Sequence, residues 1–204
     1  MSSNIVVVMA LESESQGVFE ENKVPVLYTG VGKVNATYHL TKTLIERKIA
    51  GKKTDLVLNL GSAGSRKFPA KSLVYCTKFA QRDMDVSFLG FKHGETPFET
   101  LFEAVLEHKY ELEKDLLNGI CGTGDSFETT EPKIPCDVID MEGYALAKVC
   151  LLEGVPFLSV KYITDGADDN AAKDWEPALK EGAKRLHDVY KTVVKVDEKI
   201  NEEK

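Results

Sequence analysis

The hydrophobic residues of this chain fall into short apolar runs that are separated by polar or glycine-rich positions. Apolar runs of this length are typical of strands that are buried on both faces of a sheet. We therefore predict strands over residues 5–10, 23–29, 55–60, 73–80, 86–91, 118–123, 136–139 and 155–163.

Between these runs, other segments place apolar residues three or four positions apart, which predicts helices. Glycine-rich positions mark a turn at Gly30–Gly32, a loop at Gly61–Ser65 and a helix end at Gly154. Strands that alternate with helices predict an α/β fold, here a single domain with a mixed central β-sheet flanked by helices. The predicted helices span residues 34–49, 98–108, 141–152 and a long segment from about residue 174.

Composition narrows the class of protein without assigning a function. At 204 residues and 43% hydrophobic content, the chain suffices for one sizeable core, so we expect a single domain over residues 1–204. A net charge of −7 produces no field that would attract nucleic acid or an anionic membrane. No apolar run is long enough to span a membrane, and the first residues do not resemble a signal peptide.

The cysteines and histidines are not spaced as a disulfide framework or as metal ligands. The chain has no CxxC pair, and no histidine lies at ligand spacing from a cysteine. We therefore expect reduced thiols, no metal, no cofactor and a cytoplasmic location. The residues concerned are Cys76, Cys121, Cys136, Cys150, His39, His93, His108 and His187.

Three acidic residues, Glu14, Glu142 and Asp165, follow the ends of predicted strands. In an open α/β sheet, ligands bind in the crevice beyond the carboxyl ends of the strands, so acids from distant segments can meet there. We therefore expect these three side chains to share one site.

Each acid also has an ordinary structural explanation when taken alone. Asp165 in Thr-Asp-Gly could cap a turn, and Glu142 could complement the dipole of the helix that follows it. Glu14 could be a solvated charge beside Glu12, and local sequence does not separate the two.

The segment Gly30–Lys33 invites two phosphate-binding interpretations, and both fail on individual residues. A P-loop requires Ser or Thr after the lysine, where this chain has Val34. A dinucleotide fingerprint requires glycine where this chain has Asn35. We therefore interpret the segment as a turn near a ligand site.

Taken together and in order, seven motifs resemble the purine nucleoside phosphorylase superfamily, most closely its 5′-methylthioadenosine/S-adenosylhomocysteine nucleosidase branch. One such motif is weak, whereas seven in the same order are specific. The resemblance covers about residues 7–168. The motifs are Ala10-Leu11-Glu12-Ser13-Glu14, Gly30-Val31-Gly32-Lys33-Val34-Asn35-Ala36, Asn59-Leu60-Gly61-Ser62-Ala63-Gly64, Asp83-Met84-Asp85-Val86, Gly124-Asp125-Ser126-Phe127, Asp140-Met141-Glu142 and Thr164-Asp165-Gly166-Ala167-Asp168.

The resemblance implies a nucleoside phosphorylase-like fold and cleavage of the bond between a purine base and a ribose carbon. It implies that Asp165 protonates the purine N7, that Glu142 holds the ribose and its developing positive charge, and that Glu14 activates water. Met141 would pack on the ribose and Phe127 on the base. The substrate-binding residues implied are Ser62, Ala63, Gly64, Phe127, Glu128, Met141 and Thr164.

Water is the expected nucleophile. Phosphorylases of the superfamily place an arginine two positions before the glycine-serine loop, where this chain has Asn59. Phosphorolysis is the second choice, because Lys33 or Ser62 could contact an oxyanion. A third alternative is that the chain is a nucleoside-binding protein without catalytic activity. The presence of all three acids argues against it.

Two departures from the nucleosidase branch concern the substrate. Glu128 stands where the branch usually has an apolar residue whose backbone binds adenine, which leaves the preferred base open. The chain is also shorter than usual between Phe98 and Asn118, where the pocket for a 5′-alkylthio group would be altered.

The resemblance also implies a protein partner, a second copy of the chain. The segment of Phe88, Leu89, Phe91 and Pro97 resembles the one that reaches the partner's active site in dimeric members of the family. A role of these residues in the core of the same chain is the alternative. We expect a homodimer, with a purine nucleoside as the small-molecule partner and a place in methionine salvage.

Overall fold

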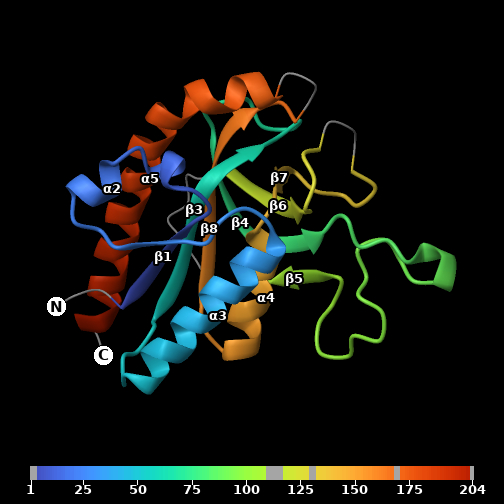
Figure 1. Cartoon of the computed structure of the whole chain (residues 1–204), viewed down its shortest axis with the longest axis horizontal. Helices are drawn as coiled ribbons and strands as arrows, with labels where there is room; N and C mark the ends of the chain where they lie inside the picture. Colours follow the sequence, from blue (N-terminus) through green and yellow to red (C-terminus); the bar gives the residue numbers. More distant parts are fainter. Residues whose placement is uncertain (1–3, 109–116, 129–131, 168–170, 203–204) are drawn as a thin grey trace.

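The computed structural model describes residues 4–108, 117–128, 132–167 and 171–202. In this part of the chain, one mixed sheet forms the centre of the molecule and helices cover it (Figure 1). The strands are β1 (Ile5–Met9), β2 (Val26–Tyr28), β3 (Leu56–Gly64), β4 (Leu73–Gln81), β5 (Val105–Glu107), β6 (Leu117–Thr123), β7 (Val138–Asp140) and β8 (Phe157–Asp165). The helices are α1 (Glu12–Ser15), α2 (Val18–Glu21), α3 (Lys33–Ile49), α4 (Gly143–Glu153) and α5 (Ala171–Glu202), with a 3₁₀ turn η1 (Ser87–Leu89).

Five of the strands close into a ring. β3 pairs with β8, β8 with β4, β4 with β6 and β6 with β7, and β7 returns to β3. The last contact joins Gly64 and Ile139 in an antiparallel pair, so the carboxyl ends of β3 and β7 meet. β1 and β2 extend the sheet in parallel from β3, and β5 adds to β4. This arrangement brings several strand ends to one place.

Two layers of helices bury the two faces of the sheet (Figure 1). α5 packs on β8 and β3 and also contacts α1 and α2, around an apolar cluster that includes Phe19, Leu58 and Leu186. On the other side, α3 packs against α4, and α4 contacts β6 and β4 around a second cluster that includes Leu40 and Leu146. None of the helices in the described residues combines the length and the apolar character needed to cross a lipid bilayer.

The expected α/β architecture is confirmed. All predicted strands except 86–91, and the helices 34–49, 141–152 and 174 onward, are found close to their predicted positions. Gly154 ends α4 in the left-handed conformation, with φ of 66°. The short helices α1 and α2 were not predicted, because each has only four residues and shows no periodicity.

Three local expectations were wrong. The predicted loop Gly61–Ser65 is mostly strand, since β3 continues to Gly64 by pairing with β8. Residues 86–91 form no strand; Asp85 accepts hydrogen bonds from the backbone N–H and hydroxyl of Ser87, which favours the turn η1. Residues 98–108 form no helix, and their last part, β5, pairs with β4 instead.

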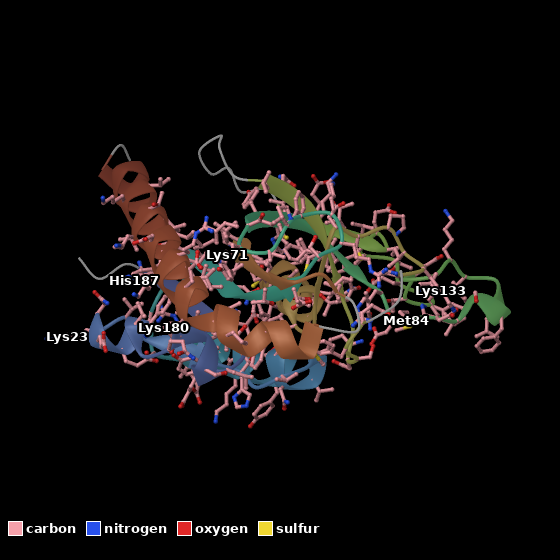
Figure 2. The ribbon with its side chains drawn as sticks, turned by 90° about the horizontal axis from the view of Figure 1, so that it is seen from above. Lys23, Lys71, Met84, Lys133, Lys180 and His187 are labelled. Carbon is pink, nitrogen blue, oxygen red and sulfur yellow. The ribbon has the colours of Figure 1, made fainter. Side chains whose placement is uncertain are left out.

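The segment 82–104 extends away from the sheet (Figure 1). In Figure 2, Met84 of this segment and Lys133 lie at the same end of the molecule, far from His187 and Lys180 on α5. An ion pair between Lys133 Nζ and Asp85 Oδ2, at 3.0 Å, joins the loop that contains Lys133 to the segment 82–104. This extension is therefore attached to the loop between β6 and β7.

Candidate active site

A cavity of about 280 Å³ lies beyond the carboxyl ends of β3, β7 and β8. The first turn after β1, the loop after β6 and α5 complete its wall. A site at this edge of the sheet is the one expected for an α/β protein. The residues that line it are Ala10, Leu11, Glu14, Val31, Ser62, Ala63, Gly64, Ser126, Phe127, Glu128, Ile139, Asp140, Met141, Glu142, Thr164, Asp165, Ala167 and Trp175.

Glu14 is held from two sides by hydrogen-bond donors. Its Oε2 accepts from the backbone N–H groups of Ala10 and Leu11, at 3.0 and 3.2 Å. Its Oε1 accepts from both the backbone N–H and the hydroxyl of Ser62, each at 2.7 Å. Glu14 is buried, whereas Glu12 on the same short helix is exposed. The fold therefore distinguishes two acids that the local sequence did not.

Glu142 stands at the N-terminal end of α4, and its Oε1 accepts a hydrogen bond of 2.8 Å from the backbone N–H of Gly32. Burial, followed by the charge of the neighbouring Asp140, raises the pKa of Glu142 to about 7. Gly32 has φ of 93°, a conformation that favours glycine, and this turn directs its N–H at the carboxylate. A carboxyl group that titrates near neutral pH in a cavity is a functional-site feature.

Asp165 ends β8 and is fixed by its neighbours in the loop. Its Oδ1 accepts from the backbone N–H of Ala167 at 2.9 Å, and its Oδ2 lies 2.7 Å from the hydroxyl of Thr164. A methyl group at Gly64 would lie 2.6 Å from Oδ1 of Asp165. The glycine therefore permits the close approach of this carboxyl group to β3.

Phe127 and Glu128 form the wall contributed by the loop after β6. The Phe127 side chain is 56% exposed. Nη1 of Arg82 donates to Oε2 of Glu128 at 2.8 Å, and the same guanidinium also donates to the backbone carbonyl oxygens of Gly124 and Ser126. The Arg82 side chain is 2% exposed, so a buried arginine fixes this loop and its carboxylate.

The structure brings the catalytic and substrate-binding residues implied by the resemblance to this one cavity. Besides the three acids and the pair Phe127 and Glu128, its lining contains Ser62, Ala63, Gly64, Met141 and Thr164. Asp168, the last residue of the seventh motif, lies outside the described residues.

No lysine or arginine side chain lines the cavity in the described part of the chain. Lys33 instead pairs with Asp83 at 2.6 Å, Arg47 donates to Thr54, and Arg66 donates to the carbonyl oxygen of Ala167. Asn59, at the position of the phosphorylase arginine, is buried and donates to the carbonyl oxygen of Val8. The cavity wall is therefore acidic and apolar.

Two residues near the site were missed by the sequence analysis. Lys161, in the middle of β8, forms an ion pair of 2.8 Å with Asp140, and both side chains are almost completely buried. Trp175, on α5, donates its indole N–H to Oγ of Ser62 at 2.8 Å. A charged residue inside an otherwise apolar run was the only signal for Lys161, and Trp175 had none because it fits the apolar face of its helix.

Sequence comparison relates this chain to nucleosidases. The profile of the phosphorylase superfamily matches residues 12–195. The chain is 29% identical to a 5′-methylthioadenosine/S-adenosylhomocysteine nucleosidase from Bacillus pumilus over 88% of this chain and 84% of that protein. It is 30% identical to one from an Exiguobacterium species, over 80% and 76% of the two chains.

Comparison of structures gives the same fold. A Helicobacter pylori 5′-methylthioadenosine/S-adenosylhomocysteine nucleosidase matches with a TM-score of 0.79 at 22% identity, over 94% of this chain and 97% of that one. The H. pylori futalosine hydrolase matches with a TM-score of 0.78 at 21% identity, over 94% and 97%. From its motifs, its fold and its match over residues 12–195, this chain belongs to the phosphorylase superfamily.

Proposed function

We propose that this protein hydrolyses the N-glycosidic bond of a purine nucleoside of the methylthioadenosine/S-adenosylhomocysteine type, releasing the free base and the ribose derivative. The observation that carries the proposal is the meeting of Glu14, Glu142 and Asp165 around one cavity whose described lining has no cationic side chain. The nucleosidases at 29% and 30% identity support the same activity.

The reaction breaks the bond between C1′ of the ribose and N9 of the purine, and the electron pair leaves with the base. Asp165 transfers a proton to N7, so that the base departs as a neutral molecule. Phe127 stacks on the purine and Thr164 orients the Asp165 carboxyl group, 2.7 Å from its hydroxyl. We assign purine binding to the end of the cavity formed by Phe127, Thr164 and Asp165.

The sugar carries positive charge as the base leaves, and Glu142 stabilises that charge while it binds the ribose hydroxyls. Met141 packs against the ribose. A water molecule attacks C1′, and its proton passes to Glu14. The Ser62 hydroxyl and backbone N–H, each 2.7 Å from Oε1 of Glu14, hold the Glu14 carboxylate at the strand end formed by Ser62, Ala63 and Gly64.

Water is favoured over phosphate by the charges of the cavity wall. Phosphate carries one or two negative charges at neutral pH and needs cationic donors, above all arginine. Around this cavity the described residues instead present carboxyl groups, and like charges in a poorly hydrated site repel strongly. Phosphorolysis is therefore the less favoured reaction.

The test is to incubate the purified protein with methylthioadenosine, S-adenosylhomocysteine, adenosine, inosine and futalosine, with and without phosphate, and to measure free base. We expect base release that does not depend on phosphate. Release that requires phosphate would identify a phosphorylase, and binding without release from any of these nucleosides would identify a binding protein.

Matched variants test the roles of individual acids. Glu14→Gln should lower kcat by about a hundredfold or more, as loss of a general base does. Glu12→Gln is its control, because Glu12 is exposed on the same helix and does not line the cavity. Full activity of Glu14→Gln would show that another group activates the water.

We also propose that the protein is a homodimer. Exposed apolar side chains support a second copy as the partner: Tyr38 is 60% exposed and Val34 78% on α3, Leu152 58% on α4, and Phe88 82% on the extended segment. Val34, Tyr38 and Leu152 line a groove of about 970 Å³ between α3 and α4. Analytical ultracentrifugation of the wild type should give twice the mass of the chain. Tyr38→Asp should lower the measured mass, whereas Lys180→Asp on α5 should leave it unchanged.

We propose further that residues 1–204 form one nucleosidase-like domain that works in a reducing, cytoplasmic environment and recycles methylthioadenosine in methionine salvage. Free thiols support the reducing environment: Cys76, Cys121 and Cys150 are buried and Cys136 is half-buried, and none is in a disulfide. Base release from methylthioadenosine by the protein under reducing conditions is the corresponding test.

A further inference from the structure

Lys161 is a buried cation that has no obvious structural reason to be charged. It lies in the middle of β8, whose residues are all buried, and its side chain is 2% exposed. Nζ of Lys161 lies 2.8 Å from Oδ2 of Asp140, whose side chain is 1% exposed. Buried ion pairs are weak contributors to stability, because both ions lose their hydration. The pair therefore calls for an explanation in terms of the site.

The pair is connected to the first turn of α4. Asp140 also accepts hydrogen bonds from the hydroxyl of Thr123 at 2.6 Å and from the backbone N–H of Gly143 at 2.8 Å. Thr123 in turn accepts from the backbone N–H of Tyr144 at 2.8 Å. Glu142 lies between Asp140 and Gly143, so this network fixes the backbone on both sides of it.

The ammonium group of Lys161 also lies near Glu14, although Lys161 does not line the cavity. A methyl group at Gly61 would lie 3.2 Å from Oε1 of Glu14 and 3.7 Å from Nζ of Lys161. Asp140, Glu142 and Glu14 line the cavity, whereas Lys161 lies behind its wall. The cation is thus placed where it acts on the acids but not on the substrate.

The groups that act on Glu142 come from four different parts of the chain. Asp140 on β7 and Glu14 on α1 raise its pKa, whereas Lys161 on β8 and the backbone N–H of Gly32 lower it. Burial of Lys161 would lower its own pKa, but the neighbouring carboxylates, Asp140 first, raise it above its ordinary value, so the cation persists.

Three further groups stand near this network. A hydrogen bond with Cys76, and burial, raise the pKa of the Cys121 thiol, which therefore stays neutral. At the rim, Asp125 accepts from the backbone N–H of Lys33, next to Gly32. Asp165 lines the same cavity. Lys161 itself pairs with Asp140, two positions before Glu142, from behind the wall.

We propose that Lys161 is a positioning residue whose buried ammonium, held by Asp140, keeps Glu142 charged beside the ribose. In the hydrolysis proposed above, on which the kinetic consequence rests, Glu142 stabilises the sugar cation only in its ionised form. Burial and Asp140 favour the neutral form, and Lys161 opposes them. Asp140 and Lys161 therefore act on Glu142 with opposite signs.

The opposite signs give the test. In Lys161→Met, Glu142 loses its attracting charge, so its titration should move to higher pH by about one unit or more. In Asp140→Asn, Glu142 loses its repelling charge, and Glu142 itself remains a neighbouring carboxylate that favours the charged form of Lys161, so the titration should move to lower pH. Lys161→Arg keeps the positive charge, so Glu142 should titrate at nearly the same pH as in the wild type. In the double variant Lys161→Met with Asp140→Asn, Glu142 should titrate at a pH between those of the two single variants.

Two measurements are needed on each variant. The first is the ¹³C NMR titration of the Glu142 carboxyl group in the free protein, assigned by its loss in Glu142→Gln. The second is the acid limb of kcat/KM against pH for the nucleoside that the wild type cleaves. Circular dichroism establishes which variants are folded. If Lys161→Met does not fold, Asp140→Asn and the double variant still give shifts that must differ in the predicted direction.

The outcomes separate the two proposals. Shifts of opposite sign in the NMR titration support the role of Lys161 whether or not the protein cleaves a nucleoside. Shifts of the same sign, or none, with the protein folded, overturn it. A wild type that titrates as expected but releases no base overturns the proposed hydrolysis and leaves the electrostatic inference standing.

Discussion

Trp175 donates its indole N–H to Oγ of Ser62 at 2.8 Å, across 113 positions of the chain. The Ser62 hydroxyl donates in turn to Oε1 of Glu14, so α5 is connected to the proposed general base by two successive hydrogen bonds. The indole occupies the acceptor side of this hydroxyl. The rotation that directs the Ser62 proton at Glu14 is thereby fixed.

Trp175→Phe should lower kcat about three- to tenfold. The variant keeps an aromatic ring in the cavity wall but removes the N–H, whose hydrogen bond is worth about 1 kcal/mol. The Ser62 hydroxyl would then be free to rotate away from Glu14. Steady-state kinetics with the best nucleoside provide the measurement, and Tyr190→Phe on the same helix is the control. An unchanged kcat would show that the indole donor has no part in positioning Glu14.

Glu142→Gln should be more stable than the wild type at high pH. The pKa of Glu142 in the folded protein is about 7 against an ordinary 4.5, so the folded chain holds the proton more tightly than the unfolded chain between these values. The free energy of unfolding of the wild type is therefore lost as pH rises through this window. The variant does not titrate and avoids that loss, so its advantage should grow by up to about 3 kcal/mol between pH 4 and pH 8.

Urea denaturation at a series of pH values measures this difference. Glu153→Gln is the control, because Glu153 is exposed at the other end of α4. Its stability should follow that of the wild type at every pH. A constant difference between Glu142→Gln and the wild type would show that Glu142 titrates at an ordinary pKa.

Gly64→Ala should lower kcat about a hundredfold with little change in fold. The added methyl group would lie 2.6 Å from Oδ1 of Asp165, so the carboxyl group must move, and a displacement of about 1 Å in an active site can cost this much. Gly61→Ala is the graded comparison, since its methyl group would lie 3.2 Å from Oε1 of Glu14. We expect a smaller loss there. Wild-type activity in both variants would show that Asp165 and Glu14 do not need the space left by these two glycines.

Glu128→Gln should raise the ratio of kcat/KM for adenosine to that for inosine about tenfold. A carboxylate fixed by Arg82 can only accept hydrogen bonds, which suits the N1–H of a 6-oxopurine, whereas an amide can also donate to N1 of adenine. Competition between the two nucleosides gives the ratio directly. Glu99→Gln, whose parent side chain pairs with Lys148 outside the cavity, is the control. An unchanged ratio would mean that the Glu128 side chain does not contact the base.

Much of the fold could be predicted because it depends on local pattern. The apolar runs that became β1, β3 and β8 are buried along almost their whole length, and such strands are recognised as nearly uninterrupted hydrophobic segments. The exceptions are residues 86–91 and 98–108, which contain apolar residues but no strand or helix of the predicted extent. Phe88 and Phe98 there are more than 80% exposed, so their hydrophobicity does not report burial within this chain.

The sequence by itself determined that three acids follow strand ends and that one edge of a sheet would gather them, since the carboxyl ends of parallel strands lie at the same edge. Tertiary structure alone decided the remainder: that Glu14 rather than Glu12 lines the cavity, that Lys161 faces Asp140, and that Trp175 reaches Ser62. The reason is physical. Burial, charge and hydrogen bonding at the site depend on partners far away in the sequence, and a local pattern contains no record of which distant side chain fills the space opposite.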